Sequence, residues 1–143
     1  MKILILNGPN LHLLGKRDPK FYGKQTLEEL NRDLKEYCDK IGVESVFLQS
    51  NHEGTLIDVL SQENFDGCVL NAGAFTHYSY AIHDTIESIS KPVVEVHLSD
   101  IEHRDDFRKQ RVFADVVKAV FMGEGIRSYQ KGIDFLKENF NEN

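Results

Sequence analysis

Ile3-Leu4-Ile5-Leu6 runs directly into Asn7-Gly8-Pro9-Asn10, so a continuous apolar stretch gives way at once to polar and turn-forming residues. A short apolar run of this kind is typical of a strand buried on both faces, as the inner strands of a parallel sheet are. Comparable runs follow at residues 43–48, 68–70, 93–98 and 116–122. The sequence therefore predicts five strands.

Amphipathic stretches separate these strands. Thr26 and Glu29 form a capping box, and apolar residues then recur at helical spacing up to Gly42, a natural C-terminal cap. Further helices are expected around residues 56–60, over 79–90 and from residue 126 onward. Alternating strands and helices predict an α/β fold: a flavodoxin-like, open five-stranded parallel sheet with helices on both faces.

Length and composition limit the classes of protein to which the chain can belong. A chain of 143 residues with 41% hydrophobic and 28% charged residues matches one globular domain, so we expect a single domain over residues 1–143. Its net charge of −6 disfavours a general nucleic-acid binder, because neutralising phosphates requires a basic surface. No apolar stretch approaches the ~20 residues of a membrane span, and no signal sequence is recognisable, so a soluble cytoplasmic protein is expected. Cys38 and Cys68 are expected to be buried single cysteines.

Polar residues follow the apolar runs at their carboxyl ends. The first strand ends in Asn7-Gly8-Pro9-Asn10 and the third in Asn71. In the fourth, a period of two places Glu95, His97 and Ser99 on the face opposite Val94, Val96 and Leu98. Each feature alone has a structural alternative, such as a turn asparagine or a buried Glu–His pair. Because open α/β sheets bind ligands at the carboxyl ends of their strands, their convergence predicts a functional crevice.

Two charged segments are candidates for contacts with an anionic ligand. The loop over about residues 15–25 carries four cations and is bounded by Gly15 and Gly23, which suits an active-site lid or, alternatively, a solvated surface loop. Arg104 and Arg108 are four residues apart, so they are expected on one helix face, where one could bind a carboxylate.

Neither a metal nor a cofactor is expected. The six histidines and two cysteines do not have the spacing of a metal site, and Glu95 with His97 supplies only two potential ligands. No glycine-rich dinucleotide motif or Walker motif follows the first strand. A flavin- or nucleotide-binding module is still an alternative, but Pro9 makes a poor phosphate loop because it lacks an N–H.

The motifs together resemble those of type II 3-dehydroquinate dehydratases. The matching segments occur in one order along nearly the whole chain: Asn7-Gly8-Pro9-Asn10-Leu11, Leu14-Gly15, Arg17, Pro19, Tyr22-Gly23, Ser50-Asn51-His52-Glu53-Gly54, Asn71-Ala72-Gly73-Ala74-Phe75-Thr76-His77 and Glu95-Val96-His97-Leu98-Ser99. The resemblance implies the cofactor-free anti elimination of water from 3-dehydroquinate, through an enolate, to give 3-dehydroshikimate in the shikimate pathway.

The resemblance also implies the catalytic roles. Tyr22 on the lid would be the general base, and Arg17 would supply positive charge that favours its phenolate. Asn10, with an ordered water, would stabilise the enolate oxygen. His97 would protonate the departing hydroxyl, and Glu95 would orient its imidazole.

Substrate binding and assembly follow from the same resemblance. The residues implied to bind the substrate or shape the pocket are Asn71, Gly73, Ala74, His77, Leu98, Ser99 and Arg108. Asp84 matches an aspartate that reaches a neighbouring subunit's site, and the family assembles as a dodecamer of trimers. Asp100, Glu102, His103, Arg111 and Glu124 depart from the family pattern, with Arg111 standing in place of a small hydroxyl residue. A scaffold that keeps the assembly without the chemistry is the second alternative, although Tyr22, Arg17 and His97 are all present.

Overall fold

A five-stranded parallel sheet runs through the molecule in the order β2-β1-β3-β4-β5. The structure is a computed structural model, which describes residues 1–16, 18, 20 and 23–141. Its strands are β1 (Lys2–Asn7), β2 (Glu44–Gln49), β3 (Gly67–Asn71), β4 (Val93–His97) and β5 (Val120–Met122). This order confirms the predicted flavodoxin-like sheet.

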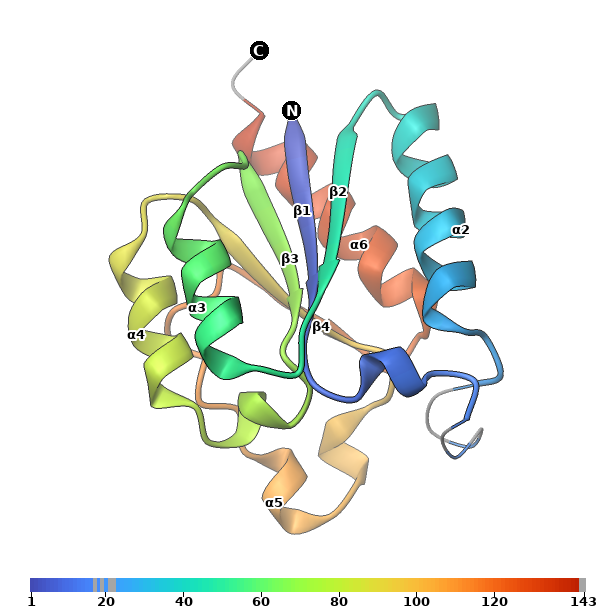
Figure 1. The fold of residues 1–143 in the computed structure, drawn as a ribbon, viewed down its shortest axis with the longest axis vertical. Coiled ribbons are helices and arrows are strands. Elements are labelled where there is room, and N and C mark those ends of the chain that lie inside the picture. The colour runs from blue at the N-terminus through green and yellow to red at the C-terminus, as the bar shows by residue number, and fades with distance from the viewer. Residues whose placement is uncertain (17, 19, 21–22, 142–143) are drawn as a thin grey trace.

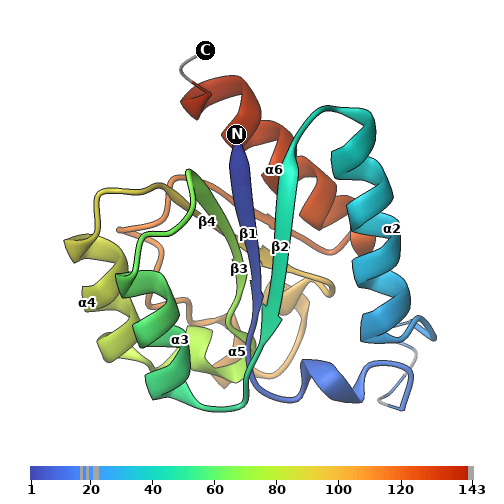
Figure 2. The ribbon, with the colours of Figure 1, turned by 45° about the horizontal axis from the view of Figure 1, so that its top comes forward.

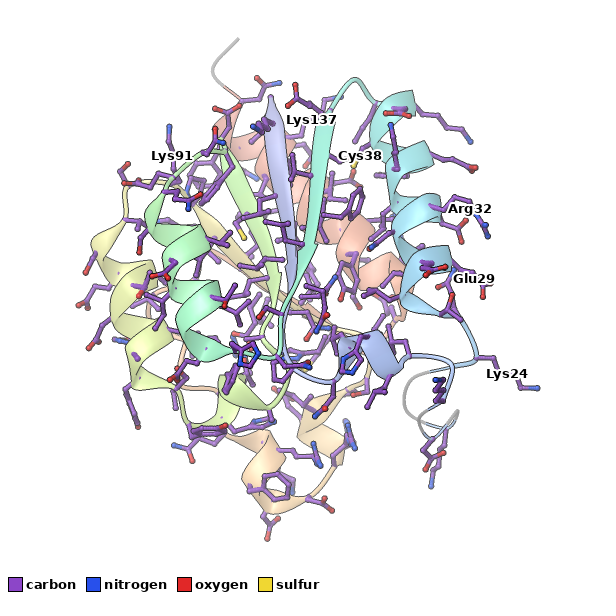
Figure 3. The ribbon with its side chains drawn as sticks, in the orientation of Figure 1. Lys24, Glu29, Arg32, Cys38, Lys91 and Lys137 are labelled. Carbon is purple, nitrogen blue, oxygen red and sulfur yellow. The ribbon has the colours of Figure 1, made fainter. Side chains whose placement is uncertain are left out.

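Helices cover both faces of the sheet (Figures 1 and 2). On one face lie α2 (Leu27–Lys40) and α6 (Ile126–Phe140), and on the other lie α3 (Glu53–Ser61) and α4 (Tyr80–Ser88). The predicted capping box begins α2, because the Thr26 hydroxyl accepts the N–H of Glu29, whose carboxylate in turn accepts the N–H of Thr26. In Figure 3, Cys38 points from α2 towards the sheet, whereas Glu29 and Arg32 point away from it.

Alternate residues of each strand enter two separate hydrophobic clusters. Ile3 and Ile5 pack on the side of α2 and α6, while Leu4 and Leu6 pack on the side of α3 and α4. β4 follows the same rule: Val94 and Val96 face α6, which places Glu95 and His97 on the face of α3 and α4, as predicted.

The structure corrects the predicted last strand, because only Val120–Met122 joins the sheet. Val116 and Val117 instead form turns, in which both N–H groups donate to the carbonyl of Phe113. Their side chains pack against the cluster on the α3 and α4 side, so they are apolar for burial and not for strand pairing.

The expected shared helix face of Arg104 and Arg108 is also wrong. Arg104 follows a 3₁₀ turn, η3 (Ile101–His103), with an extended backbone, and the short helix α5 (Asp106–Lys109) begins only afterwards. The extended residue interrupts the helical periodicity between the two arginines.

Short elements gather at the carboxyl ends of the strands, which we call the carboxyl edge (Figure 1). They are η1 (Leu11–Leu13) after β1, η2 (Gly73–His77) after β3, and η3 and α5 after β4. Among the helices of the described residues, none is long and apolar enough to span a membrane.

Candidate active site

The ends of β1 and β3 meet at the centre of the carboxyl edge. Asn7 and Asn71 are register partners, and the next N–H, of Gly8, donates to the Asn71 carbonyl at 2.7 Å. A Cβ on Gly8 would lie 2.6 Å from the carbonyl oxygen of Ala72, so glycine is required where the segments after β1 and β3 approach each other. This close approach brings the residues that follow both strands to one place.

A buried hydrogen-bond network fixes the amide of Asn71. The Tyr129 hydroxyl, from α6, donates to Oδ1 of Asn7 at 2.6 Å and accepts from Nδ2 of Asn71 at 2.9 Å. Oδ1 of Asn71 accepts the N–H of Gly73 at 3.1 Å. Burial raises the pKa of Tyr129 well above its ordinary value, so this hydroxyl stays a donor. The orientation of the Asn71 amide is therefore fixed by partners at both its nitrogen and its oxygen.

Asn10 has a left-handed backbone with a φ of 69°, which asparagine tolerates better than most residues. Its N–H donates to Oδ1 of Asn51 at 3.1 Å, and Gln49 donates to the same oxygen at 3.1 Å. The turn after β1 is thus held against the segment after β2. The N–H groups of Gly8 and Asn10 already have partners and Pro9 has none, which argues against a phosphate loop here.

Glu95 and His97 form a buried pair on β4. Nε2 of His97 lies 2.6 Å from Oε2 of Glu95, which is fully buried and also accepts the Thr76 hydroxyl at 2.9 Å. The guanidinium of Arg111 pairs with both carboxylate oxygens. Burial acts to raise the pKa of Glu95, but hydrogen bonds from His97 and Arg111 outweigh it and lower the pKa to about 2. The carboxylate is therefore ionised and only accepts.

His77 is held by a hydrogen bond to the backbone. Its Nδ1 lies 2.8 Å from the carbonyl of Gln110, and because a carbonyl only accepts, Nδ1 carries the hydrogen. Burial lowers the pKa of His77 and outweighs the hydrogen bond to Gln110, which acts to raise it. The neutral imidazole is therefore favoured, and in that form Nε2 is an acceptor.

These segments enclose a cavity of about 110 Å³ at the carboxyl edge. The residues that line it come from the segments after β1, β3 and β4 and from α5: Pro9, Asn10, Leu11, Asn71, Gly73, Ala74, His77, His97, Leu98, Ser99, Ile101, Arg104 and Arg108. No Asp or Glu of the described residues is among them, although the whole chain is acidic. Arginines, histidines and amides without a lining carboxylate suit an anion that also carries hydroxyl groups.

A wider groove of about 560 Å³ adjoins this pocket and shares Leu98, Ser99 and Arg104 with it. Its lining continues to Lys20 and Gly23 of the loop over residues 15–25. The described part of that loop therefore borders the groove next to the pocket.

The structure brings most of the predicted site residues together. Asn10, Asn71, Gly73, Ala74, His77, His97, Leu98, Ser99 and Arg108 all line the pocket. Glu95 lies behind His97, and Asp84 lies on the exposed side of α4, where it accepts from His83 at 2.8 Å, away from the pocket of its own chain. Arg17 and Tyr22 lie outside the described residues, so their placement stays a prediction.

Sequence reasoning assigned no role to Arg111, Thr76 or Tyr129. Thr76 belongs to one of the segments that carry the family resemblance, and Arg111 stands out in the sequence only as a departure from the family pattern. Tyr129 was indistinguishable from the other apolar positions of α6, because its partner Asn7 is 122 residues away. Within residues 1–16, 18, 20 and 23–141, no three histidine, cysteine or acidic side chains are grouped so that they could hold a metal ion.

Comparison with known proteins agrees with this geometry. The sequence model of the family described as Dehydroquinase class II matches residues 1–137. The chain belongs to this family. A protein of Bacillus pumilus named 3-dehydroquinate dehydratase is 49% identical over 93% of the chain and 92% of its own length. A protein of the same name from Thermotoga maritima is 45% identical over 99% of both chains.

A solved class II structure supports the same assignment. The type II dehydroquinase of Butyrivibrio crossotus superimposes with a TM-score of 0.93, at 42% identity over 96% of this chain and 97% of that one. This chain is thus an enzyme of the class II dehydroquinases, which are hydro-lyases.

Two departures from the family pattern have local partners. Asp100 accepts the N–H of Glu102 at 3.1 Å and Nδ1 of His103 at 2.7 Å, so it caps η3. Glu124 pairs with Lys131 on the surface of α6. Neither Asp100 nor Glu124 lines the pocket around His97.

Proposed function

We propose that this chain removes water from 3-dehydroquinate to give 3-dehydroshikimate, by an anti elimination through an enolate and without a cofactor. The observation that carries the proposal is the pocket around His97, which is lined by arginine side chains and asparagine amides. The chain that holds this pocket belongs to the class II dehydroquinases. The substrate is an anion with a ketone and several hydroxyl groups, which matches this lining. The reaction belongs to the shikimate pathway towards chorismate and the aromatic amino acids.

The first step is removal of a proton from the carbon next to the ketone. We assign it to the phenolate of Tyr22, on a lid formed by about residues 15–25. A tyrosine has an ordinary pKa near 10, so a nearby guanidinium, which we assign to Arg17, is needed to favour the phenolate. Closure of the lid would exclude water and strengthen this interaction. The groove that reaches Lys20 and Gly23 supports such a lid.

The electron pair of the broken C–H bond moves onto the ketone oxygen and forms the enolate. Asn10, with a bound water, is the group assigned to stabilise that oxygen. When the enolate collapses, the carbon–oxygen bond of the departing hydroxyl breaks, and His97 supplies the proton that makes the leaving group water. Glu95, 2.6 Å from Nε2 of His97, orients the imidazole for this step.

Substrate binding is assigned to the remaining lining residues. Asn71, His77, Ser99, Arg108 and the backbone of Leu98 would hold the carboxylate and hydroxyls, while Gly73 and Ala74 shape the wall. Support comes from the fixed amide of Asn71 and from the position of Arg108, whose side chain is mostly buried at the pocket.

The proposal includes self-association. We propose one catalytic domain over residues 1–143, assembled as a dodecamer of trimers in the cytoplasm, with Asp84 reaching a neighbouring subunit's site. The exposed aromatic residues support an interface: Tyr78, Tyr80 and Phe107 are each more than half exposed.

A continuous ultraviolet assay tests the reaction by following the conjugated enone that forms from 3-dehydroquinate. We expect turnover that is unchanged when borohydride is present, because no Schiff base forms on a lysine. Inactivation by borohydride only in the presence of substrate would contradict the enolate route. Absence of turnover by the folded protein would contradict the proposed function itself.

A further inference from the structure

Arg111 pairs with Glu95, the buried carboxylate that also contacts His97. Its Nη2 lies 2.9 Å from Oε1 of Glu95 and its Nε lies 3.1 Å from Oε2, so the guanidinium donates to both carboxylate oxygens. The side chain of Arg111 is only 16% exposed, and that of Glu95 is not exposed at all. This is a buried, two-point ion pair.

The backbone on both sides of Arg111 is tied to η2. The carbonyl of Gln110 accepts Nδ1–H of His77 at 2.8 Å, and the N–H of Val112 donates to the carbonyl of Thr76 at 2.9 Å. The Thr76 hydroxyl also donates to Oε2 of Glu95. The position of the guanidinium is therefore set by the same segment that forms one wall of the pocket.

The ion pair decides which ring nitrogen of His97 carries hydrogen. An arginine is permanently charged, so it keeps the buried Glu95 carboxylate ionised and unable to donate. Nε2 of His97, 2.6 Å from that carboxylate, must then be the donor. Nδ1 has no hydrogen-bond partner in the described part of the chain, and His97 lines the pocket, so Nδ1 is the nitrogen left for a ligand.

Arg111 also changes the charge that His97 experiences. Without the guanidinium, the imidazolium of His97 would be the only positive charge paired with the buried carboxylate. With Arg111 in place, part of the carboxylate charge is already neutralised. The other charged or titratable groups around His97, among the described residues, are those of His77, Arg104 and Arg108.

We infer that Arg111 is a positioning residue, which fixes the tautomer of His97 and makes its imidazolium a readier proton donor to the departing hydroxyl. The inference rests on the proposed function, because it concerns the acid of that reaction. Arg111 itself does not line the pocket among the described residues and is assigned no contact with the substrate.

Three variants test this inference. Arg111→Gln removes the charge, and Arg111→Lys keeps the charge but not the bidentate hydrogen bonds. Arg32→Gln is the control, because Arg32 is exposed on α2 (Figure 3). The measurements are kcat and KM across pH, together with long-range ¹H–¹⁵N spectra of the His97 ring in ¹⁵N-histidine-labelled protein. The spectra report the tautomer and its titration whether or not the protein turns over substrate.

We expect Arg111→Gln to lower kcat by about tenfold or more, a part of what general acid catalysis contributes, with KM little changed. The alkaline limb of its kcat profile should move to higher pH, because the imidazolium would then be the only charge paired with Glu95. Arg111→Lys should restore the position of that limb and part of the rate. In the wild-type protein the spectra should place the hydrogen of neutral His97 on Nε2.

Several results would overturn the inference. They are a wild-type spectrum with the hydrogen on Nδ1, an Arg111→Gln variant whose rate and pH limb match the wild type, or a variant in which only KM rises. If Arg111→Gln does not fold, Arg111→Lys and the wild-type spectrum still decide. If the wild-type protein does not turn over 3-dehydroquinate, the proposed function fails, while an unchanged His97 titration in Arg111→Gln would separately refute the effect of Arg111.

Discussion

Tyr129 shows, at the scale of single residues, how a side chain buried in a helix can fix a residue of the pocket. Its hydroxyl is the link between Asn7 and Asn71, and all three side chains are buried. Loss of that oxygen would leave an amide oxygen and an amide N–H without a partner in a region that excludes water. A buried polar group left unsatisfied costs about 1–3 kcal/mol.

We therefore predict that Tyr129→Phe lowers the free energy of unfolding by about 1–3 kcal/mol and raises KM, because the amide of Asn71 is no longer fixed. Urea unfolding and steady-state kinetics measure the two effects. Tyr37→Phe is the matched control, since Tyr37 donates to Asp134 at 2.5 Å between α2 and α6, away from the pocket. An unchanged KM in Tyr129→Phe would show that the network does not position Asn71.

The residues that sequence reasoning missed share a physical reason. Glu95, His97 and Asn71 could be predicted because they break the apolar pattern of strands whose ends must meet at one edge. Arg111 lies in a charged segment that reads as a solvated surface, and its partner Glu95 is set by the path of the chain between them. No local pattern specifies such tertiary pairing.

Among the elements, the close approach of the segments that follow β1 and β3 sets the geometry of the site. Gly8 donates to the carbonyl of Asn71, and Gly73 has a φ of +58° beside Pro9. The backbones of the two segments are therefore in direct contact, and the ring of Pro9 lies beside Gly73.

Gly8→Ala should accordingly destabilise the protein by roughly 1–3 kcal/mol and lower activity, because the new Cβ would meet the backbone carbonyl of Ala72. Gly54→Ala in α3 is the control: nothing lies within 4 Å of its added Cβ, and alanine favours the helix by up to about 1 kcal/mol. Thermal unfolding of both variants is the measurement. A Gly8→Ala variant as stable as the wild type would mean that the strand ends separate easily.

Elements were predictable where local periodicity agrees with tertiary packing. The helix that begins at Thr26 and the alternation of β4 were predicted correctly for this reason. The last strand was predicted too long, because apolar residues buried by turns have the same composition as a strand.

At the scale of the whole molecule, the lowered pKa of Glu95 makes stability depend on pH. Folding lowers this pKa from 4.5 to about 2, so the folded state favours the ionised form. The resulting stabilisation is complete above pH 4.5 and is lost as the pH falls towards 2.

We predict that the free energy of unfolding falls over this acid range and that Glu95→Gln shows a shallower fall. The variant should also be less stable at neutral pH by roughly 3–5 kcal/mol, because Arg111 is left buried without a counter-charge. Urea unfolding at a series of pH values is the measurement, with the exposed Glu87→Gln as the control. Parallel pH curves for Glu95→Gln and the wild type would contradict the assignment.

Assembly is the second property at this scale. We predict that light scattering after size exclusion gives the mass of twelve chains of 16.4 kDa. Burial of the exposed aromatic residues at the start of α4 and in α5 would favour this association. A protein that has the mass of one chain and full activity would show that the pocket needs no neighbouring subunit.

Kinetics with 3-dehydroquinate decide whether the pocket around His97 carries out the elimination. The comparison is between the wild type, His97→Ala and the control His12→Ala, whose side chain is exposed and does not line the pocket. We predict turnover by the wild type and by His12→Ala, and a loss of about 100-fold or more in kcat for His97→Ala, in line with general acid catalysis. Near-normal turnover by a folded His97→Ala variant would contradict the role of this pocket.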